Sequence, residues 1–109
     1  MDLLTYAITK KKLKGAGKPT KVSVSGAAPE ITAADNTVYQ CGEVTSITVT
    51  ADTDIAFTVI FISGSTPATM TMDDNIVMPD GFTVEANTRY EINVSDGYAL
   101  AAGWAVSLT

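Results

Sequence analysis

The feature that most limits the fold of this chain is the local residue pattern of positions 22–109. Short runs rich in β-branched and aromatic residues alternate there with turn-forming residues, and no apolar stripe recurs with helical spacing. This pattern predicts an all-β fold, a small β-sandwich or partly closed barrel of about seven to nine short strands. The predicted strands are residues 21–26, 37–43, 44–51, 54–63, 68–72, 82–86, 89–95, 98–102 and 104–108.

One run, residues 55–62 ("IAFTVIFI"), is apolar on both faces of a strand. Residues 46–51 ("SITVTA") instead alternate apolar and hydroxyl side chains, as a strand with one buried face does. The doubly apolar run therefore predicts either the central strand of two packed sheets or a strand that another subunit also covers.

The pattern Asn-Thr-x-Tyr occurs twice, at residues 36–39 and 87–90, which lie 51 positions apart. Asn tolerates positive φ better than most residues, so we expect Asn36 and Asn87 to occupy turns in that conformation. The threonine would then begin a strand, with the tyrosine two residues later on the same face. We interpret the repeat as architecture, with one copy at an equivalent corner in each sheet.

Charge divides the chain into two parts. Residues 1–21 contain six of the seven Lys and Arg residues and one of the twelve acidic residues, a formal charge of +5. Because the whole chain carries −5, residues 22–109 carry −10. We therefore predict a basic N-terminal arm and linker over residues 1–21, attached to an acidic β-sandwich body over residues 22–109.

The arm begins with "MDLLTYAITKKK", in which Asp2 is placed to cap a short helix with one apolar stripe. Such a helix would be marginal in isolation. A disordered tail is the alternative, but the apolar residues favour a segment that orders against a partner. The predicted partner-binding residues are Leu3, Leu4, Tyr6, Ile8, Lys10, Lys11, Lys12 and Lys14.

The residues needed for most enzymatic chemistry are missing. With no histidine and one cysteine, the chain cannot build a Ser-His-Asp or Cys-His catalytic unit or a zinc site of the common type. Cys41 lies in a predicted strand, where a buried structural thiol is the usual interpretation. The acids of residues 73–81 ("DDNIVMPDG") lack the spacing of a calcium loop and predict a solvated turn. We expect no enzymatic activity, no catalytic residues, no cofactor and no metal site.

Two aromatic residues near the end of the chain are candidates for binding. Tyr98 and Trp104 follow "SDG" and "AAG" and could present a face that stacks on sugar rings. Core packing or a subunit interface explains them more simply.

The sequence also bears on location. The longest strongly apolar run, residues 59–62, is far too short to cross a membrane, and the charges of residues 1–12 follow their apolar patch, the reverse of a secretory signal. The lysines of the arm lack interleaved aromatic residues, and the acidic body repels phosphate. We expect no membrane or nucleic-acid partner, and synthesis in a bacterial cytoplasm without a cleaved signal.

Three stretches carry a resemblance: "MDLLTYAITKK", "VYQCGEVTSITVT" and "FISGSTPATMTM…PDGFTVEANTRYEINVSDGYALAAGW". In these stretches, which cover most of the chain, the sequence resembles small proteins encoded in the structural-gene regions of phages and prophages of Firmicutes. It departs from that pattern in continuing five residues beyond Trp104 and in having "MTMDDN" where a Leu-Pro-Asp turn is more usual. The resemblance implies a virion structural protein.

Size and charge favour one kind of virion protein. A body of about 90 residues is too small for a long fibre, whereas an arm joined to a compact module suits a protein that clips onto a lattice. We expect a capsid decoration protein on the virion surface, bound through its arm to other virion proteins and forming a homo-oligomer, with a trimer as the expected state. The alternative is a tail-tip or baseplate adsorption module that binds host cell-wall glycan.

Overall fold

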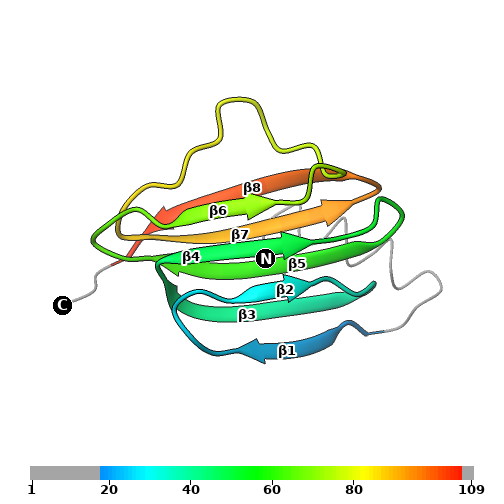
Figure 1. Cartoon of the computed structure of the whole chain (residues 1–109), viewed down its shortest axis with the longest axis horizontal. Coiled ribbons are helices and arrows are strands. Elements are labelled where there is room, and N and C mark those ends of the chain that lie inside the picture. The colour runs from blue at the N-terminus through cyan, green and yellow to red at the C-terminus, as the bar shows by residue number, and fades with distance from the viewer. Residues whose placement is uncertain (1–17, 107–109) are drawn as a thin grey trace.

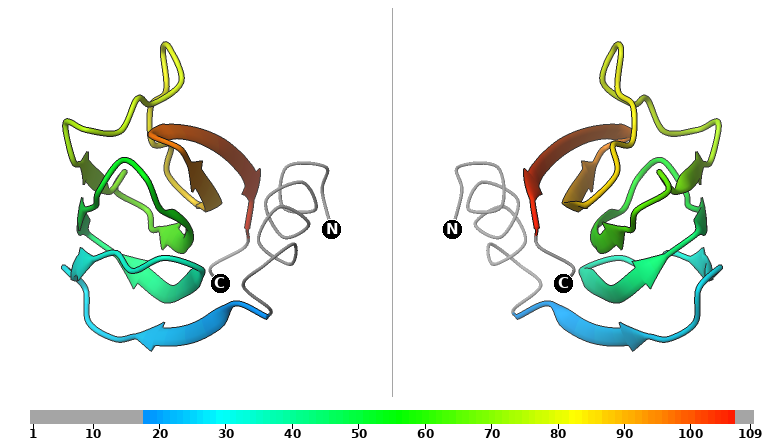
Figure 2. Two further views of the ribbon diagram at one scale, coloured as in Figure 1. Left: turned by 90° about the vertical axis from the view of Figure 1, so that its right-hand side faces the viewer. Right: turned by 90° about the vertical axis from the view of Figure 1, so that its left-hand side faces the viewer.

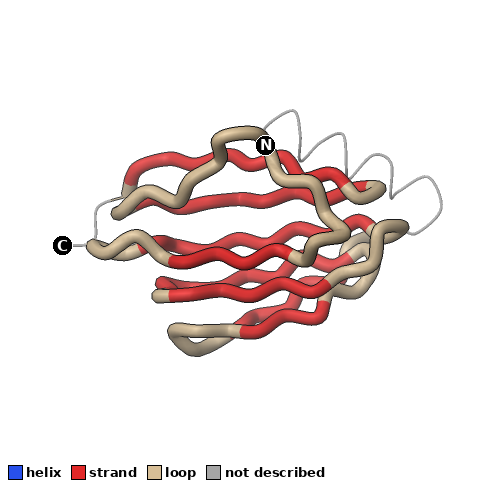
Figure 3. Tube along the Cα trace, turned by 45° about the horizontal axis from the view of Figure 1, so that its top comes forward, coloured by secondary structure: helices blue, strands red, loops and turns tan. Residues whose placement is uncertain are grey.

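Eight strands and no helix make up the described part of the chain. The computed structural model describes residues 18–106, shown along the chain in Figure 1 and by secondary structure in Figure 3. The predicted all-β fold is confirmed. The strands are β1 (Thr20–Val24), β2 (Glu30–Thr32), β3 (Thr37–Val44), β4 (Ser46–Thr50), β5 (Ala56–Ser63), β6 (Thr69–Met72), β7 (Thr88–Ser95) and β8 (Tyr98–Ala105).

The strands form two sheets that pack face to face. A five-stranded sheet has the order β1-β3-β5-β7-β8, and a three-stranded sheet has the order β2-β4-β6. The end-on views of Figure 2 show the two sheets as separate layers that do not join into a closed barrel. Of the two predicted forms, the sandwich is the one observed.

Strands β1 to β6 wind between the two sheets. Odd-numbered strands enter the five-stranded sheet, even-numbered strands enter the three-stranded sheet, and all pairs among these six strands are parallel. Thr20 pairs with Thr37 and Thr37 with Phe57, so one coil takes 17 residues and the next takes 20. The chain then reverses, because β7 is antiparallel to β5 and β8 is antiparallel to β7.

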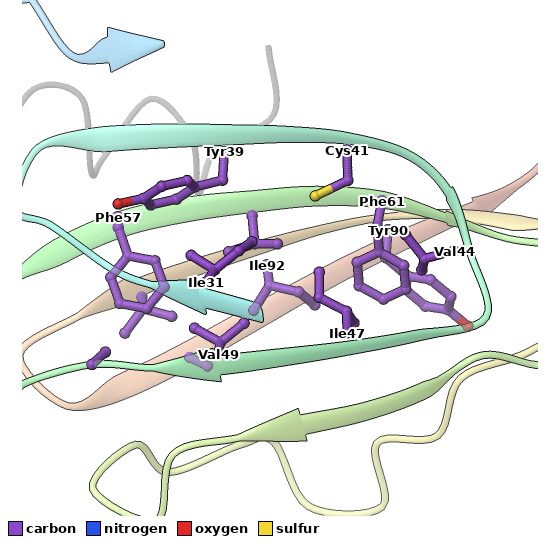
Figure 4. Close-up of a cluster of buried hydrophobic side chains, with 14 of the residues drawn as sticks. Ile31, Tyr39, Cys41, Val44, Ile47, Val49, Phe57, Phe61, Tyr90 and Ile92 are labelled. Atoms are coloured by element: carbon purple, nitrogen blue, oxygen red, sulfur yellow. The ribbon is translucent and has the colours of Figure 1, made fainter. Parts of the chain in front are cut away.

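The core lies between the sheets and follows from the alternation of side chains along each strand. Phe57, Val59 and Phe61 of β5 meet Ile47 and Val49 of β4 there, and each of these side chains is at most 2% exposed (Figure 4). Burial of one such side chain contributes about 1.5–3 kcal/mol. Both sheets therefore depend on the same cluster.

A loop compensates for the unequal widths of the two sheets. Residues 73–87, the projecting loop at the top of Figure 1, lead from β6 to β7. Ile76 is buried, and Phe82 packs against the core cluster in a T-shaped contact with the Tyr90 ring. Val77 forms a β-bridge with Tyr98 at the start of β8. This loop supplies core side chains where the narrower sheet has no strand.

The doubly apolar run forms β5, and β5 is the central strand of the five-stranded sheet, as predicted. Every residue of β5 except Ile62 is buried. Other strand predictions were wrong in detail. Residues 82–86 form a loop, residues 98–102 and 104–108 do not form two strands because β8 runs without a break to Ala105, and β2 was not predicted.

The reason for the first error lies in what an alternating pattern reports. Burial does alternate along residues 82–86, where partly buried side chains alternate with exposed ones. No neighbouring strand runs beside it to accept a ladder of backbone hydrogen bonds, and a strand requires that ladder.

The two Asn-Thr-x-Tyr copies form the same corner. Asn36 and Asn87 have φ angles of 57° and 53°, as predicted. In each copy the threonine hydroxyl donates to the carbonyl two residues earlier, at 3.0 and 2.9 Å. Each tyrosine hydroxyl accepts the backbone N–H five residues earlier at 2.7 Å and donates to the carbonyl seven residues earlier at 3.4 Å.

The expected placement of one corner in each sheet was wrong. The corners begin β3 and β7, which both flank β5 in the five-stranded sheet. Thr37 pairs with Phe57 near the start of β5, whereas Thr88 pairs with Ser63 at its end. Because β3 and β7 run in opposite directions, the corners hold opposite ends of the central strand.

Candidate interaction surface on the five-stranded sheet

The side of the five-stranded sheet that faces away from the three-stranded sheet is the candidate site, and we call it the outer face. The pairing of β3, β5, β7 and β8 places alternate residues of each strand on it. No described strand packs on this side. Its apolar members are Val38, Ala56, Ile60, Ile62, Tyr98, Leu100, Ala102 and Trp104.

The most exposed part of this face is a row of side chains on β8, an edge strand. Tyr98 is 66% exposed, Leu100 46% and Trp104 43%. Six residues separate Tyr98 from Trp104, which corresponds to about 20 Å along a strand. The guanidinium carbon of Arg89 lies 4.8 Å from the centroid of the Trp104 ring and stacks one side of it. The row is an extended, exposed apolar surface along the edge strand.

A buried polar pair interrupts the centre of the outer face. Thr58 of β5 and Asn93 of β7 are direct neighbours across the ladder, and the threonine hydroxyl donates to the amide oxygen at 2.8 Å. The amide nitrogen of Asn93 donates to a carboxylate oxygen of Glu91 at 3.3 Å. Asn93 is 1% exposed, so these bonds offset the cost of removing its amide from water.

The corresponding surface of the three-stranded sheet is of a different kind. Its strands turn apolar residues such as Ile47 and Val49 inward, and the residues between them carry hydroxyl and carboxyl groups suited to water. These outward residues are Glu30, Thr32, Ser46, Thr48, Thr50, Thr69 and Thr71. Of the two outward sheet surfaces, only that of the five-stranded sheet carries large apolar side chains, which stand beside polar residues such as Arg89 and Glu91.

The structure places the sequence-predicted binding residues unequally. Tyr98 and Trp104 lie on the same side of one strand and are exposed, so the core-packing alternative does not hold for them. Sugar stacking and a subunit interface both remain predictions. The arm residues lie outside the described residues: Leu3, Leu4, Tyr6, Ile8, Lys10, Lys11, Lys12 and Lys14.

Sequence reasoning missed Leu100 and Ile60 as members of this surface. The double apolar character of β5 was a signal for Ile60, since one of its faces must point away from the sandwich core. Leu100 had a weaker signal, its spacing of two from Tyr98 and four from Trp104. The earlier division into two strands hid that common face.

The acid-rich turn holds a structural carboxylate. Asp73 accepts hydrogen bonds from the backbone N–H groups of Asn75 at 3.0 Å and Ala51 at 3.1 Å. These two bonds hold the pKa of the Asp73 carboxyl below its ordinary value. Within residues 18–106, no three His, Cys, Asp or Glu side chains lie close enough together to hold a metal ion.

The single thiol belongs to the core. Cys41 is 7% exposed and packs in the same cluster as Tyr39, and burial raises the pKa of its thiol. A raised pKa lowers the fraction of reactive thiolate at neutral pH. In the described part of the chain, the outer face presents the exposed apolar and aromatic side chains of β8.

No protein family, curated protein or solved structure matches the chain. Among residues 18–106, no helix has the length and apolar character needed to cross a membrane.

Proposed function

We propose that this chain is a bacteriophage virion structural protein, a capsid decoration protein that attaches to a lattice of other virion proteins through its N-terminal arm. The resemblance of its sequence to small phage structural proteins of Firmicutes supports the virion role. In this proposal the protein acts at the virion surface as a homo-oligomer, with a trimer as the proposed state.

The observation that carries the attachment proposal is the division of charge between the arm and a compact sandwich. Residues 1–21 carry +5 and the remaining residues −10. A basic segment of this kind can pair with an acidic lattice surface, and repetition across many copies converts a weak contact into firm attachment. The eight named strands contain none of the first seventeen residues, because β1 begins at Thr20.

Removal of residues 1–17 tests this proposal. This deletion leaves β1 complete, whereas a deletion to residue 21 would remove part of an edge strand. We expect the truncated protein to fold, with the far-UV circular dichroism of the sandwich retained, and to lose binding to particles that lack the native protein. Wild-type occupancy of particles by the truncated protein would contradict anchoring through the arm.

A matched variant separates the contribution of the arm's lysine charges to particle binding from that of its apolar side chains. Replacing Lys10, Lys11, Lys12 and Lys14 with glutamine leaves Leu3, Leu4 and Ile8 in place. If electrostatic pairing contributes, particle binding by the wild type falls as salt concentration rises, and the variant shows a weaker salt dependence. Equal salt dependence of the two proteins would show that the four lysines do not contribute to particle binding.

The exposed aromatic row favours a second candidate function, a tail-tip or baseplate adsorption module for host cell-wall glycan. Tyr98 and Trp104 are both exposed on one face of β8, as sugar stacking requires. Binding of the isolated protein to purified cell-wall polysaccharide, lost in Trp104→Ala, together with few copies per particle, would favour this candidate. Many symmetry-related copies and no polysaccharide binding would favour decoration.

A further inference from the structure

The outer face of the five-stranded sheet carries large apolar side chains on two of its strands, β5 and β8, and Ile60 on this face is only 9% exposed. Ile60 and Ile62 lie at its centre, and Leu100 and Trp104 extend it to the edge strand β8. The outward surface of the three-stranded sheet, built mainly of threonines, shows that this sequence does provide a polar surface where a sheet meets water. The residues Arg89, Glu91, Asn93 and Ser95 of β7 separate the apolar rows of β5 and β8, and the exposed side chains of the β8 row mark a site of contact.

The position at which the described chain begins indicates which segment can cover the outer face. The chain enters the five-stranded sheet at Thr20 of β1, one edge of that sheet, and Trp104 lies on β8, the other edge. Four strand spacings of about 4.8 Å separate β1 from β8, a span of about 19 Å. The eleven residues from Thr9 to Thr20 can span about 36–40 Å when extended, so residues 2–9 reach any point of the outer face.

The chemistry of that segment complements the surface. Leu4 and Ile8 share a face at helical spacing, with Leu3 and Ala7 beside them, and supply the apolar side chains. The lysines that follow would lie near a body with a formal charge of −10, whose outer face includes Glu43. A second copy of the body would instead bring together two bodies that each carry a formal charge of −10, which opposes association.

We propose that residues 2–9 of this chain pack in cis on the outer face of the five-stranded sheet, over Ile60, Leu100 and Trp104. The segment covers the apolar surface of its own body in the free protein. The inference goes beyond the proposed function and does not depend on it, since it concerns the isolated protein. On a particle, the same segment would leave its own sheet for a partner's surface.

Fluorescence of Trp104 tests the packing, because the chain contains one tryptophan and that residue lies on the proposed surface. We compare the full chain with a variant that lacks residues 1–9. Loss of the segment should shift the Trp104 emission to longer wavelength and increase its quenching by acrylamide. Unchanged emission and quenching in a folded truncated protein would overturn the proposal.

Point variants guard against indirect effects of truncation. Leu4→Ser with Ile8→Ser removes the two apolar contacts and keeps the length and charge of the arm, and it should reproduce the changes in Trp104 fluorescence. Thr5→Ser with Thr9→Ser, off the apolar stripe in the same segment, serves as the matched control and should behave as the wild type. Equal behaviour of the two double variants would contradict the proposal.

A disulfide separates packing within one chain from exchange between chains. Leu4→Cys combined with Leu100→Cys should give an intrachain disulfide under mild oxidation, while the buried Cys41 stays reduced. Mixing isotopically light and heavy protein identifies any interchain product by mass. An intrachain product supports the proposal, whereas an interchain product or no disulfide overturns it. These readouts use no particle, so they are independent of the test of anchoring.

Discussion

At the scale of single residues, the two Asn-Thr-x-Tyr corners show why one short pattern appears twice. In each copy the asparagine adopts positive φ, the threonine hydroxyl bonds to the preceding turn, and the tyrosine hydroxyl holds the segment leading into the turn. The asparagine, the threonine and the tyrosine each have a structural role, so two corners of the same geometry use the same three side chains. The sequence predicted the φ angles but could not reveal the tyrosine bonds, because their partners depend on the path of the preceding loop.

The tyrosine hydroxyls should contribute measurably to stability. In Tyr90→Phe the backbone N–H of Glu85 loses its acceptor in a partly buried position, so we expect a loss of about 1–2 kcal/mol in the free energy of unfolding. Urea titration monitored by circular dichroism measures this loss. Tyr98→Phe, at an exposed position, should change stability by less than about 0.5 kcal/mol. Equal effects of the two substitutions would show that the corner bond contributes nothing.

Asp73 should make stability depend on pH. Its pKa is lower in the folded state than in the unfolded chain because the carboxylate accepts two backbone N–H bonds. The stabilisation is therefore complete above the unfolded value of about 3.9 and is lost as pH falls through the folded pKa. Asp73→Asn should be less stable than the wild type at pH 7, and the difference should narrow in acid.

Urea titrations at pH 7 and at several values below about pH 4 measure that difference. Asp74→Asn is the matched control, because Asp74 is exposed beside Asp73 and accepts neither of those two backbone bonds. A stability difference between the wild type and Asp73→Asn that stays constant with pH would contradict the assigned role.

At the scale of elements, the sequence predicted strands well where alternation and turn signals agreed. It failed where an element is defined by its neighbours. β2 has three residues and exists because Ile31 pairs with Val49 of β4. Residues 82–86 have the alternation of a strand without a partner strand. For the site, exposed Tyr98 and Trp104 could be nominated from the sequence, whereas the surface they share with Ile60 follows only from the register of three strands.

The side chains of Tyr90 and Thr88 occupy the space beside Gly103 of β8, where a larger residue would place its Cβ. A Cβ at Gly103 would lie 2.8 Å from Cε1 of Tyr90 and 3.2 Å from Cγ2 of Thr88. The Tyr90 ring stacks on Phe61 at 5.4 Å and has little room to move. We expect Gly103→Ala to cost about 1–3 kcal/mol in unfolding free energy, as overpacking does.

Differential scanning calorimetry of Gly103→Ala measures this cost as a lower melting temperature. Gly42→Ala is the matched control, since a Cβ at Gly42 meets no atom within 4 Å. The control should retain the stability of the wild type to within about 0.5 kcal/mol. A loss in the control as large as that in Gly103→Ala would contradict contact with the Tyr90 ring as the cause.

At the scale of the whole molecule, the parallel winding determines how the chain folds. Partners in the parallel pairs lie at least 17 residues apart, and Ser46 and Thr69 of β4 and β6 are separated by 23. The loops between such partners must close before their contacts form, which slows folding. We expect refolding in milliseconds to seconds in stopped-flow experiments on Trp104 fluorescence. Refolding within microseconds would contradict this expectation.

The parallel winding also determines at which edge of the two sheets further strands can be added. β1 and β2 are edge strands of their sheets, so an additional coil of about 17–20 residues ahead of them would add one strand to each sheet and about 4.8 Å to the stack. The reversal into β7 and β8 ends the five-stranded sheet on the opposite side. Length variants built from whole coils would therefore extend toward the N-terminus and keep the C-terminal hairpin as a constant cap.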